Sequence, residues 1–379
     1  MLSARGALPQ PHRQPHPITP PNHSRIPSLD GLRALAVLVV FVGHGRTDQG
    51  QWPGYAGVTV FFFLSGFLIT TLLRRELENT GTVSLRRFYL RRTFRILPAT
   101  YFAIALSLAL AAIGAVPSSV SGWGVLAEVL NYTNYYIVAN GYQSLPPETS
   151  QMWSLAVEEQ YYLVVPVALL LAYRLGAPRR WVGWSLVTLA LLTAVWRIKL
   201  GMSGAGFDRL YFSTDTRIDS ILWGAAFALL LNPVMGDVSR IGRRAQRWIS
   251  RHLAGIAIGA TATFVVTAAI PMLSFRLSIA TTLQCISLVP IFWFLITRPS
   301  SAIGRFLNSR PLVRLGVLSF SFYLLHKMVL AVVTPLFDAP IVTDALSLAG
   351  SIAAAQLVFW AVERPFTRLR ARLERKFLP

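Results

Sequence analysis

Residues 57–73, GVTVFFFLSGFLITTLL, form an uncharged run that ends at the pair Arg74-Arg75. A run of this length and apolarity agrees with the roughly 17–25 residues that a helix needs to cross the hydrocarbon core of a bilayer. Arginines directly after such a run are typical of the cytoplasmic end of a membrane span. The stretch therefore predicts a transmembrane helix, and other parts of the chain repeat its pattern.

The composition of the chain also indicates a membrane protein. Of 379 residues, 54% are hydrophobic and 14% are charged, whereas a soluble protein has about 25% charged residues. The single cysteine, Cys285, lies within an apolar run, so a disulfide within the chain is excluded. Residues 1–27 lack the apolar core that a signal peptide requires, and we expect them to form a disordered cytoplasmic lead.

Ten segments are apolar enough to predict an all-α, polytopic membrane bundle of about ten transmembrane helices. Their approximate ranges are 29–45, 57–73, 97–116, 153–173, 181–197, 216–232, 253–271, 277–297, 315–335 and 342–362. The segment 123–139 is apolar too, but it contains Glu128, two asparagines and three tyrosines. We interpret it as an interfacial or re-entrant segment, because amphipathic aromatic residues are enriched at the membrane surface.

The basic residues predict the orientation of the bundle. They gather in alternate loops, and the opposite loops contain only Arg46, Lys199, Arg209 and Arg276. Because Lys and Arg are enriched in cytoplasmic loops, both termini are predicted to be cytoplasmic. Topology thus accounts for the net charge of +20, and a nucleic-acid partner is not expected.

Ionisable side chains inside membrane spans are costly and mark candidate functional sites. The first span begins with Asp30-Gly-Leu-Arg33 and ends at His44. Arg33 and His44 are about three helical turns apart, or roughly 16 Å along the axis. The structural alternatives are a snorkelling arginine at the interface and a histidine that bonds to a loop at the helix end.

A second polar group opens the fourth span, where Trp153-Ser154-Leu-Ala-Val-Glu158-Glu159 places two carboxylates on an apolar helix. The structural alternative is that acidic residues stabilise a helix N-terminus. In the predicted topology, Glu158 and His44 lie at similar depths near the outer leaflet. We expect Glu158 to orient the imidazole of His44 and make it a better general base.

Three further groups are candidates. Arg92 and Arg95 lie one turn apart at the entrance of the third span and are suited to clamp phosphates. Asp219 enters the sixth span two residues after an arginine, with which we expect it to pair. In the ninth span, His326 follows Tyr323 by three residues on one face, among serines that often only hold helices together. The sequence has no GxSxG and no group with metal-ligand spacing, so a metal site is not expected.

In this order, the motifs resemble the acyltransferase-3 family of membrane O-acyltransferases. The matching stretches are SLDGLRALAVLVVFVGH (28–44), GVTVFFFLSGFLIT (57–70), RRTFRILPATY (91–101), WSLAVEEQYYL (153–163), RIDSILWGAAFA (217–228), SFSFYLLH (319–326) and ERPF (363–366). One position departs from the family, because its GVD sequence is GVT here, with Thr59 in place of the acid. The resemblance predicts a transmembrane domain at 28–366 and a basic cytoplasmic tail at 367–379.

Members of this family transfer an acyl group, commonly acetyl, from cytoplasmic acyl-CoA to a hydroxyl group. The resemblance therefore implies a bacterial inner-membrane enzyme with acyl-CoA as donor and a sugar, glycan or glycosylated small molecule as acceptor. Exopolysaccharides, lipid-linked sugars, O-antigen, secreted glucans and macrolides all remain candidate acceptors. Some relatives carry a C-terminal hydrolase-like domain outside the membrane. This chain ends soon after the last motif, and we expect it to act alone or with a separate periplasmic partner.

The resemblance assigns the family's motif residues to positions already singled out. Catalytic roles are expected for His44, Glu158 and Arg33, CoA phosphate binding for Arg92 and Arg95, and acceptor contacts for Trp153, Asp219, Tyr323 and His326. His44 either removes the proton of the acceptor hydroxyl or is itself transiently acylated. The rival hypothesis is a ten-span transporter or flippase of a glycan or lipid intermediate. Polar residues within spans favour it, and the lack of obvious inverted repeats does not.

Overall fold

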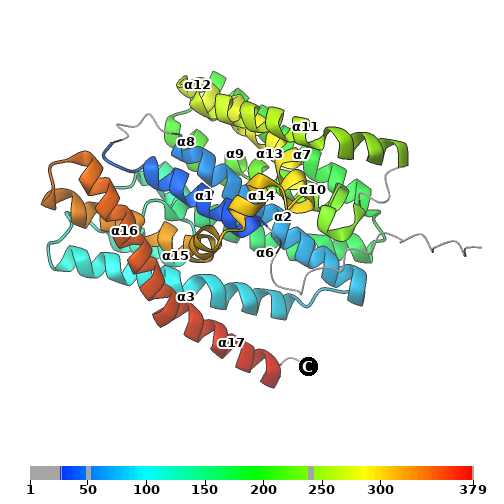
Figure 1. Cartoon of the computed structure of the whole chain (residues 1–379). Helices are drawn as coiled ribbons and strands as arrows, with labels where there is room; N and C mark the ends of the chain where they lie inside the picture. Colours follow the sequence, from blue (N-terminus) through cyan, green and yellow to red (C-terminus); the bar gives the residue numbers. More distant parts are fainter. Residues whose placement is uncertain (1–25, 27, 48–52, 238–242, 378–379) are drawn as a thin grey trace, which may run out of the picture.

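The computed structural model describes residues 26, 28–47, 53–237 and 243–377 (Figure 1). Apart from Ile26, the lead predicted at 1–27 lies outside the described residues. The described parts of the chain form helices and connecting loops, and no strand occurs in them. The all-α fold class is confirmed.

Eight helical segments of the described chain are long and apolar enough to cross a membrane. They contain α2 (Gly54–Thr80), α3 (Leu85–Ala112), α6 (Met152–Arg174), α7 (Arg179–Met202), α11 (Arg243–Ala269), α13 (Thr281–Thr297), α15 (Arg310–Val333) and α16 (Pro340–Val358). Each of them coincides with a predicted span. The chain is a polytopic membrane bundle.

The other two predicted spans coincide with shorter helices. α1 (Leu29–Val42) has 14 residues and α10 (Asp219–Leu230) has 12. At 1.5 Å per residue these are about 21 and 18 Å long, less than the hydrocarbon thickness of roughly 30 Å. α1 packs between α2 and α15, and α10 packs against α2 and α7. Because other helices surround them, their lengths need not match the thickness of the lipid.

Glycines allow the backbones of the central helices to touch. A Cβ on Gly66 of α2 would collide with the carbonyl oxygen of Ile221, and one on Gly224 of α10 would collide with that of Phe63. Between α15 and α1, a Cβ on Gly316 would meet the carbonyl oxygen of Asp30. Small residues at helix crossings are the usual means of close packing in membranes. These contacts hold α1, α2, α10 and α15 together as the centre of the bundle.

The apolar segment at 123–139 folds as two eight-residue helices, α4 (Gly122–Val129) and α5 (Thr133–Asn140). Neither is long enough to cross a membrane, which agrees with an interfacial or re-entrant segment. Glu128 is buried and accepts a hydrogen bond from Thr149. Burial raises the pKa of Glu128 to about 8, and the hydrogen bond from Thr149 opposes that shift.

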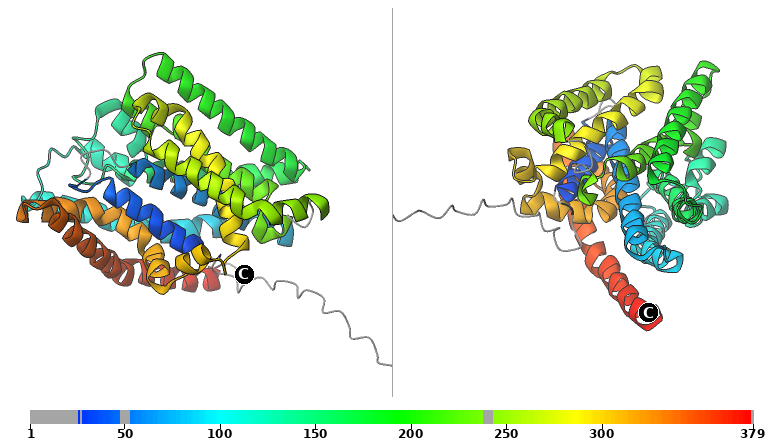
Figure 2. Two further views of the ribbon diagram at one scale, coloured as in Figure 1. Left: turned by 45° about the horizontal axis from the view of Figure 1, so that its top comes forward. Right: turned by 90° about the vertical axis from the view of Figure 1, so that its right-hand side faces the viewer.

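The remaining helices connect or extend the spans. They are α8 (Phe207–Phe212), α9 (Thr214–Arg217), η1 (Pro233–Met235), α12 (Leu273–Phe275), η3 (Arg276–Ala280), α14 (Ala302–Leu307), η4 (Thr334–Leu336), η5 (Phe359–Glu363) and α17 (Arg364–Phe377). The basic tail predicted at 367–379 forms most of α17, as far as the structure describes it. α17 runs outward beyond the other helices (Figure 2).

An ion-pair cluster holds the loop after α10 against the bundle. Arg74 donates to both carboxylate oxygens of Asp237, at 2.5 and 2.7 Å, and Arg179 donates to one of them at 2.8 Å. Burial favours the neutral acid, but Arg74 and Arg179 outweigh it and hold the pKa of Asp237 below its usual range. The cluster fixes η1, which lies between α10 and Asp237.

Candidate active site

A cavity of about 1310 Å³ runs along α2 from Val58 to Asn79. These two residues are about 32 Å apart along the helix axis, which is most of the length of a span. The wall of the cavity also includes residues of α1, α3, α6, α15 and α17, together with η1. The volume exceeds the roughly 300–1,000 Å³ of ordinary ligand pockets, so the cavity is suited to a long ligand.

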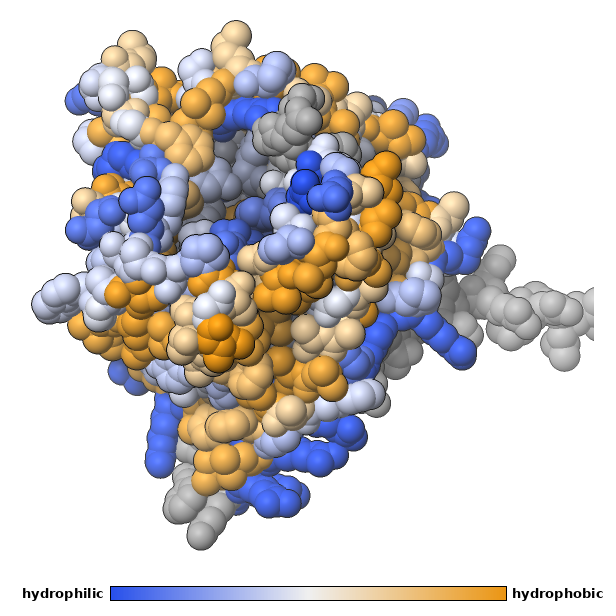
Figure 3. All heavy atoms as spheres, turned by 90° about the vertical axis from the view of Figure 1, so that its left-hand side faces the viewer, coloured by the Kyte–Doolittle hydropathy of each residue, from blue (hydrophilic) through white to orange (hydrophobic). Residues whose placement is uncertain are grey.

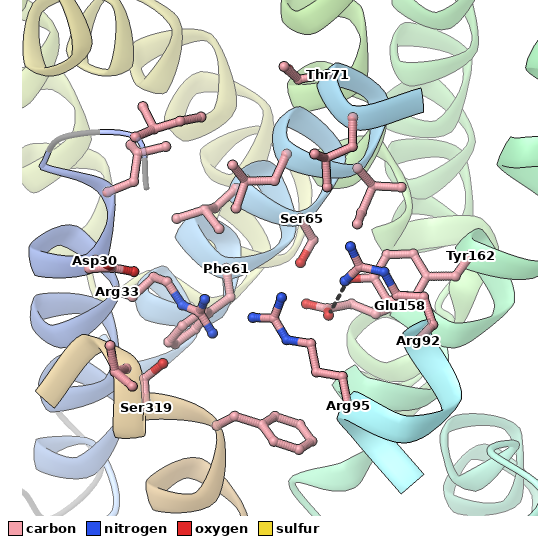
Figure 4. A pocket seen from close by; sticks show the side chains of 18 of the residues that line it. Asp30, Arg33, Phe61, Ser65, Thr71, Arg92, Arg95, Glu158, Tyr162 and Ser319 are labelled. Atoms are coloured by element: carbon pink, nitrogen blue, oxygen red, sulfur yellow. Dashed lines mark hydrogen bonds between the residues drawn. The ribbon is translucent and has the colours of Figure 1, made fainter. Parts of the chain in front are cut away.

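Three guanidinium groups and the carboxylate of Glu158 lie close together in this cavity (Figure 4). Arg33 comes from α1, Arg92 and Arg95 come from α3, and Glu158 comes from α6. Among the described residues, no carboxylate lies within 4 Å of any of the three guanidinium groups. The cavity wall carries five arginines and three carboxylates, those of Asp30, Glu158 and Glu363. Because excess positive charge is costly to bury, the cluster favours an anion with several oxygens.

Hydroxyl groups hold Glu158 in place. Its Oε2 accepts a hydrogen bond from Tyr162 Oη at 3.0 Å, and Ser65 of α2 bonds to the same carboxylate. The ring of Tyr162 also supports Arg92, whose Cζ lies 5.2 Å from the ring centroid. Sequence reasoning missed Ser65, whose only trace is that it is the single hydroxyl in the apolar run 60–69.

Tyr323 lines the cavity at the end nearest to His326, whose ring centroid lies 5.8 Å from that of Tyr323. Its hydroxyl donates to the carbonyl oxygen of Gln151 at 3.0 Å and lies 2.7 Å from Ser154 Oγ. Its ring lies 6.2 Å from that of Phe61, measured between centroids. Ser154, Phe61 and Tyr323 all line the cavity. They form a layer between the arginine cluster and the residues beyond it.

A pair of histidines lies beyond this layer. His44, just after α1, is exposed, whereas His326 of α15 is fully buried. His44 Nδ1 lies 2.9 Å from the carbonyl oxygen of Val40 and 3.2 Å from His326 Nε2. His326 Nδ1 lies 2.8 Å from the carbonyl oxygen of Tyr323. Among the described residues, no third metal-ligating side chain joins this pair.

The hydrogen bonds assign the tautomers of both histidines. A carbonyl oxygen only accepts hydrogen bonds, so the Nδ1 atom of each imidazole carries the hydrogen. His326 Nε2 then accepts from His44 Nδ1–H. This arrangement leaves Nε2 of His44 as an unprotonated nitrogen, the form that a general base requires.

Residues 26–363 match the model of the acyltransferase domain family. The chain belongs to this acyltransferase family. It is 29% identical over 364 residues to the peptidoglycan O-acetyltransferase OatA of Listeria monocytogenes. The alignment covers 90% of this chain and 56% of that protein. Alignments with two Staphylococcus aureus proteins each cover 90% of this chain and 57% of the relative. The two proteins are the putative O-acetyltransferase SACOL0978 of strain COL, at 29% identity over 373 residues, and the O-acetyltransferase OatA of strain NCTC 8325, at 27% over 375.

The chain spans a little over half the length of these curated relatives. No solved structure matches it. Thr59, where the family often has an acid, donates to the carbonyl oxygen of Tyr55 at 3.2 Å in its own helix. Thr59 is buried outside the cavity lining.

The expected contact between Glu158 and His44 is wrong. His44 bonds to His326 instead, and Glu158 belongs to the arginine cluster. The reason is depth. Gln151, at the start of α6, donates to the carbonyl oxygen of Leu324 at 3.0 Å, two residues before His326. Glu158 lies seven residues further along α6, which is about 10 Å.

Three residues that were expected to contact the acceptor, Trp153, Asp219 and His326, lie outside the cavity. Asp219 pairs with Arg197 at 2.8 Å, both side chains are fully buried, and the expected pair with Arg217 does not form. The guanidinium of Arg217 lies instead 5.9 Å from the ring of Trp153. Trp153 packs edge-on against Phe62. Of the expected acceptor contacts, Tyr323 alone lines the cavity.

The opposite end of the molecule is hollowed as well. Figure 3 shows the face at which α8 and α12 lie, with a hollow that has hydrophilic residues inside it. The chain just after His44 is held at this end, because Arg46 N–H donates to Asp344 at the start of α16 at 2.8 Å. The arginine cluster and the histidine pair therefore lie toward different ends of the bundle.

Proposed function

We propose that this chain transfers an acetyl group from acetyl-CoA to a hydroxyl of a sugar or cell-envelope glycan. The observation that supports this function most is the long cavity in which Arg33, Arg92 and Arg95 form no direct ion pair with any carboxylate of the described chain. CoA is a long molecule with several phosphate groups, and one guanidinium group can donate two parallel hydrogen bonds to a phosphate. The names of the relatives support acetyl as the acyl group and a glycan as the acceptor.

In the proposed reaction, the phosphates bind the arginine cluster and the pantetheine arm extends toward Tyr323. The ring of Tyr323 has to move before the thioester can reach His44. Nε2 of His44 then removes the proton of the acceptor hydroxyl, whose oxygen attacks the thioester carbonyl. The carbon–sulfur bond breaks, and the CoA thiolate takes up the proton from His44. In the alternative, Nε2 of His44 itself accepts the acetyl group first.

His326 is a positioning residue in this mechanism. Its Nε2 shares the Nδ1–H of His44 with the carbonyl oxygen of Val40, and together they keep the opposite nitrogen of His44 available as a base. When His44 becomes protonated, the same bond stabilises the imidazolium. The buried position of His326 agrees with an indirect role, because a substrate meets the exposed His44 first.

Release of CoA thiol tests the function. Purified protein in proteoliposomes is expected to release free thiol only when acetyl-CoA and a muropeptide acceptor are both present, whereas a transporter or flippase releases none. Arg92→Ala is expected to raise the apparent KM for acetyl-CoA about 10- to 100-fold, with little change in kcat, because it removes hydrogen bonds to a charged group. Arg86→Ala is the matched control, since Arg86 is an exposed arginine of the same helix outside the cavity. An unchanged KM in Arg92→Ala would contradict the donor site.

We also propose that the arginine cluster faces the cytoplasm and the histidine pair faces the opposite side. The arginine-rich loops support this orientation. A phosphatase that is active only outside the cytoplasm is expected to be active when fused after Thr47 and inactive when fused after Thr80. The reverse pattern would overturn the orientation, and with it the idea that the acetyl group crosses the membrane during the reaction.

A further inference from the structure

α17 carries an apolar side and a basic side next to each other. At 100° per residue, the apolar side consists of Phe366, Leu369 and Leu373, and the basic side of Arg364, Arg368, Arg372 and Arg375. Phe366 and Leu369 are 40% and 43% exposed. The four arginines of the basic side are exposed as well. Both sides are therefore open to the surroundings of the bundle.

The third side of α17 faces the bundle. Glu374 accepts a hydrogen bond from Arg91 of α3 at 2.8 Å. Thr367 and Arg370 line the cavity that holds the arginine cluster. α17 is thus attached to α3 along one side and forms part of the cavity wall.

The position of α17 along the chain places it at the edge of the membrane. The helical run Pro340–Arg375 has 36 residues, about 54 Å, which exceeds the roughly 40–45 Å of a bilayer with its headgroups. The π-helical turn η5 interrupts the run between α16 and α17, and such turns bend helices. Ser321 donates to Glu363 in this turn and attaches it to α15. Beyond it, α17 extends sideways past the other helices (Figure 2).

We propose that α17 lies in the membrane interface and that its basic side binds the headgroups of anionic phospholipids. The apolar side inserts among the acyl chains, as in other amphipathic interfacial helices. The four arginines then lie at the level of the headgroup phosphates. Each basic residue near an anionic leaflet strengthens binding by roughly fivefold. A zwitterionic bilayer has the same apolar depth but no net charge, so it holds α17 more weakly.

The lipid contact also fixes one wall of the cavity, because α17 contributes Thr367 and Arg370 to it. We expect anionic lipid to lower the apparent KM for acetyl-CoA. This consequence rests on the proposed function, whereas the lipid contact itself does not.

Hydrogen exchange tests the lipid contact in the full-length protein. The protein is placed in nanodiscs of phosphatidylcholine alone or of phosphatidylcholine with phosphatidylglycerol. In nanodiscs with phosphatidylglycerol, the backbone amides within residues 364–375 are expected to exchange at least about tenfold more slowly than in phosphatidylcholine alone, because several arginines contribute to the contact. The double variant Arg368→Gln/Arg372→Gln is expected to lose most of this difference. The control Arg244→Gln/Arg251→Gln, at exposed positions of α11, is expected to retain it.

Equal exchange in the two nanodiscs, or equal slowing in the Arg368→Gln/Arg372→Gln variant, overturns the lipid contact. Slower exchange without a lower KM supports the lipid contact and overturns its coupling to the cavity. Exchange is read without any substrate. Absence of acetyl transfer would therefore refute the proposed function and leave the result for α17 standing.

Discussion

Replacing His44 with alanine is expected to lower kcat for acetyl transfer by about 10²- to 10⁴-fold, the usual contribution of a general base. Acetyl-CoA binding is expected to survive, because His44 does not belong to the cavity lining that contains Arg33, Arg92 and Arg95. The measurements are the rate of CoA release at saturating acetyl-CoA and the equilibrium binding of acetyl-CoA to the purified variant.

Two variants accompany His44→Ala. His252→Ala removes an exposed histidine of α11 and is expected to leave turnover unchanged. His326→Phe keeps an aromatic ring but removes one of the two acceptors of the His44 Nδ1–H and leaves only the carbonyl oxygen of Val40, so it is expected to lower kcat without changing the KM for acetyl-CoA. Turnover close to that of the unaltered protein in purified His44→Ala would show that the catalytic assignment is wrong.

Asp219→Ala is expected to lower the free energy of unfolding by about 3–5 kcal/mol, because it leaves the buried guanidinium of Arg197 without its counter-charge. Both side chains of this pair are 0% exposed. The remaining hydrogen bonds of Arg197 go to the carbonyl oxygens of Ser278 and Thr216 and to the hydroxyl of Thr282, which are all neutral groups. Thermal unfolding in detergent, followed by the yield of monodisperse protein, measures the loss.

Asp215→Ala is the matched control, since it breaks an ion pair with Arg209 that is 41% and 32% exposed. Exposed pairs contribute about 0–1 kcal/mol, so this variant is expected to unfold close to the unaltered protein. If Asp219→Ala instead had normal stability and a raised KM for the acceptor, Asp219 would be the acceptor contact that the sequence predicts, and its structural role would be refuted.

The sequence identifies charged residues that are costly to place in a membrane and the helices that carry them, but not the residues that they contact. Glu158 was singled out because a carboxylate in a span is expensive, and it does line the cavity. The expected contact of Glu158 with His44 was wrong because the depth of Glu158 along α6 determines which residues it contacts. A misjudgement of that depth by two helical turns moves the side chain by about 11 Å. Ser65 and Arg370 were missed, since a serine in an apolar helix and an arginine in a basic tail are both ordinary.

The run 57–73 predicts a spanning helix without any tertiary information, because a backbone in lipid has to satisfy its polar groups within its own segment. The sequence by itself therefore determined the all-α class, the eight long helices and the residues whose charge needs an explanation. Only the tertiary structure decided which of these residues meet. His44 and His326 are 282 residues apart in the chain, and Arg33, Arg92 and Glu158 come from three helices. Their convergence depends on close backbone contacts, such as Gly66 with Ile221. Local periodicity predicts which face of its helix a residue occupies. It predicts neither which helix packs against that face nor the depth at which the two helices cross.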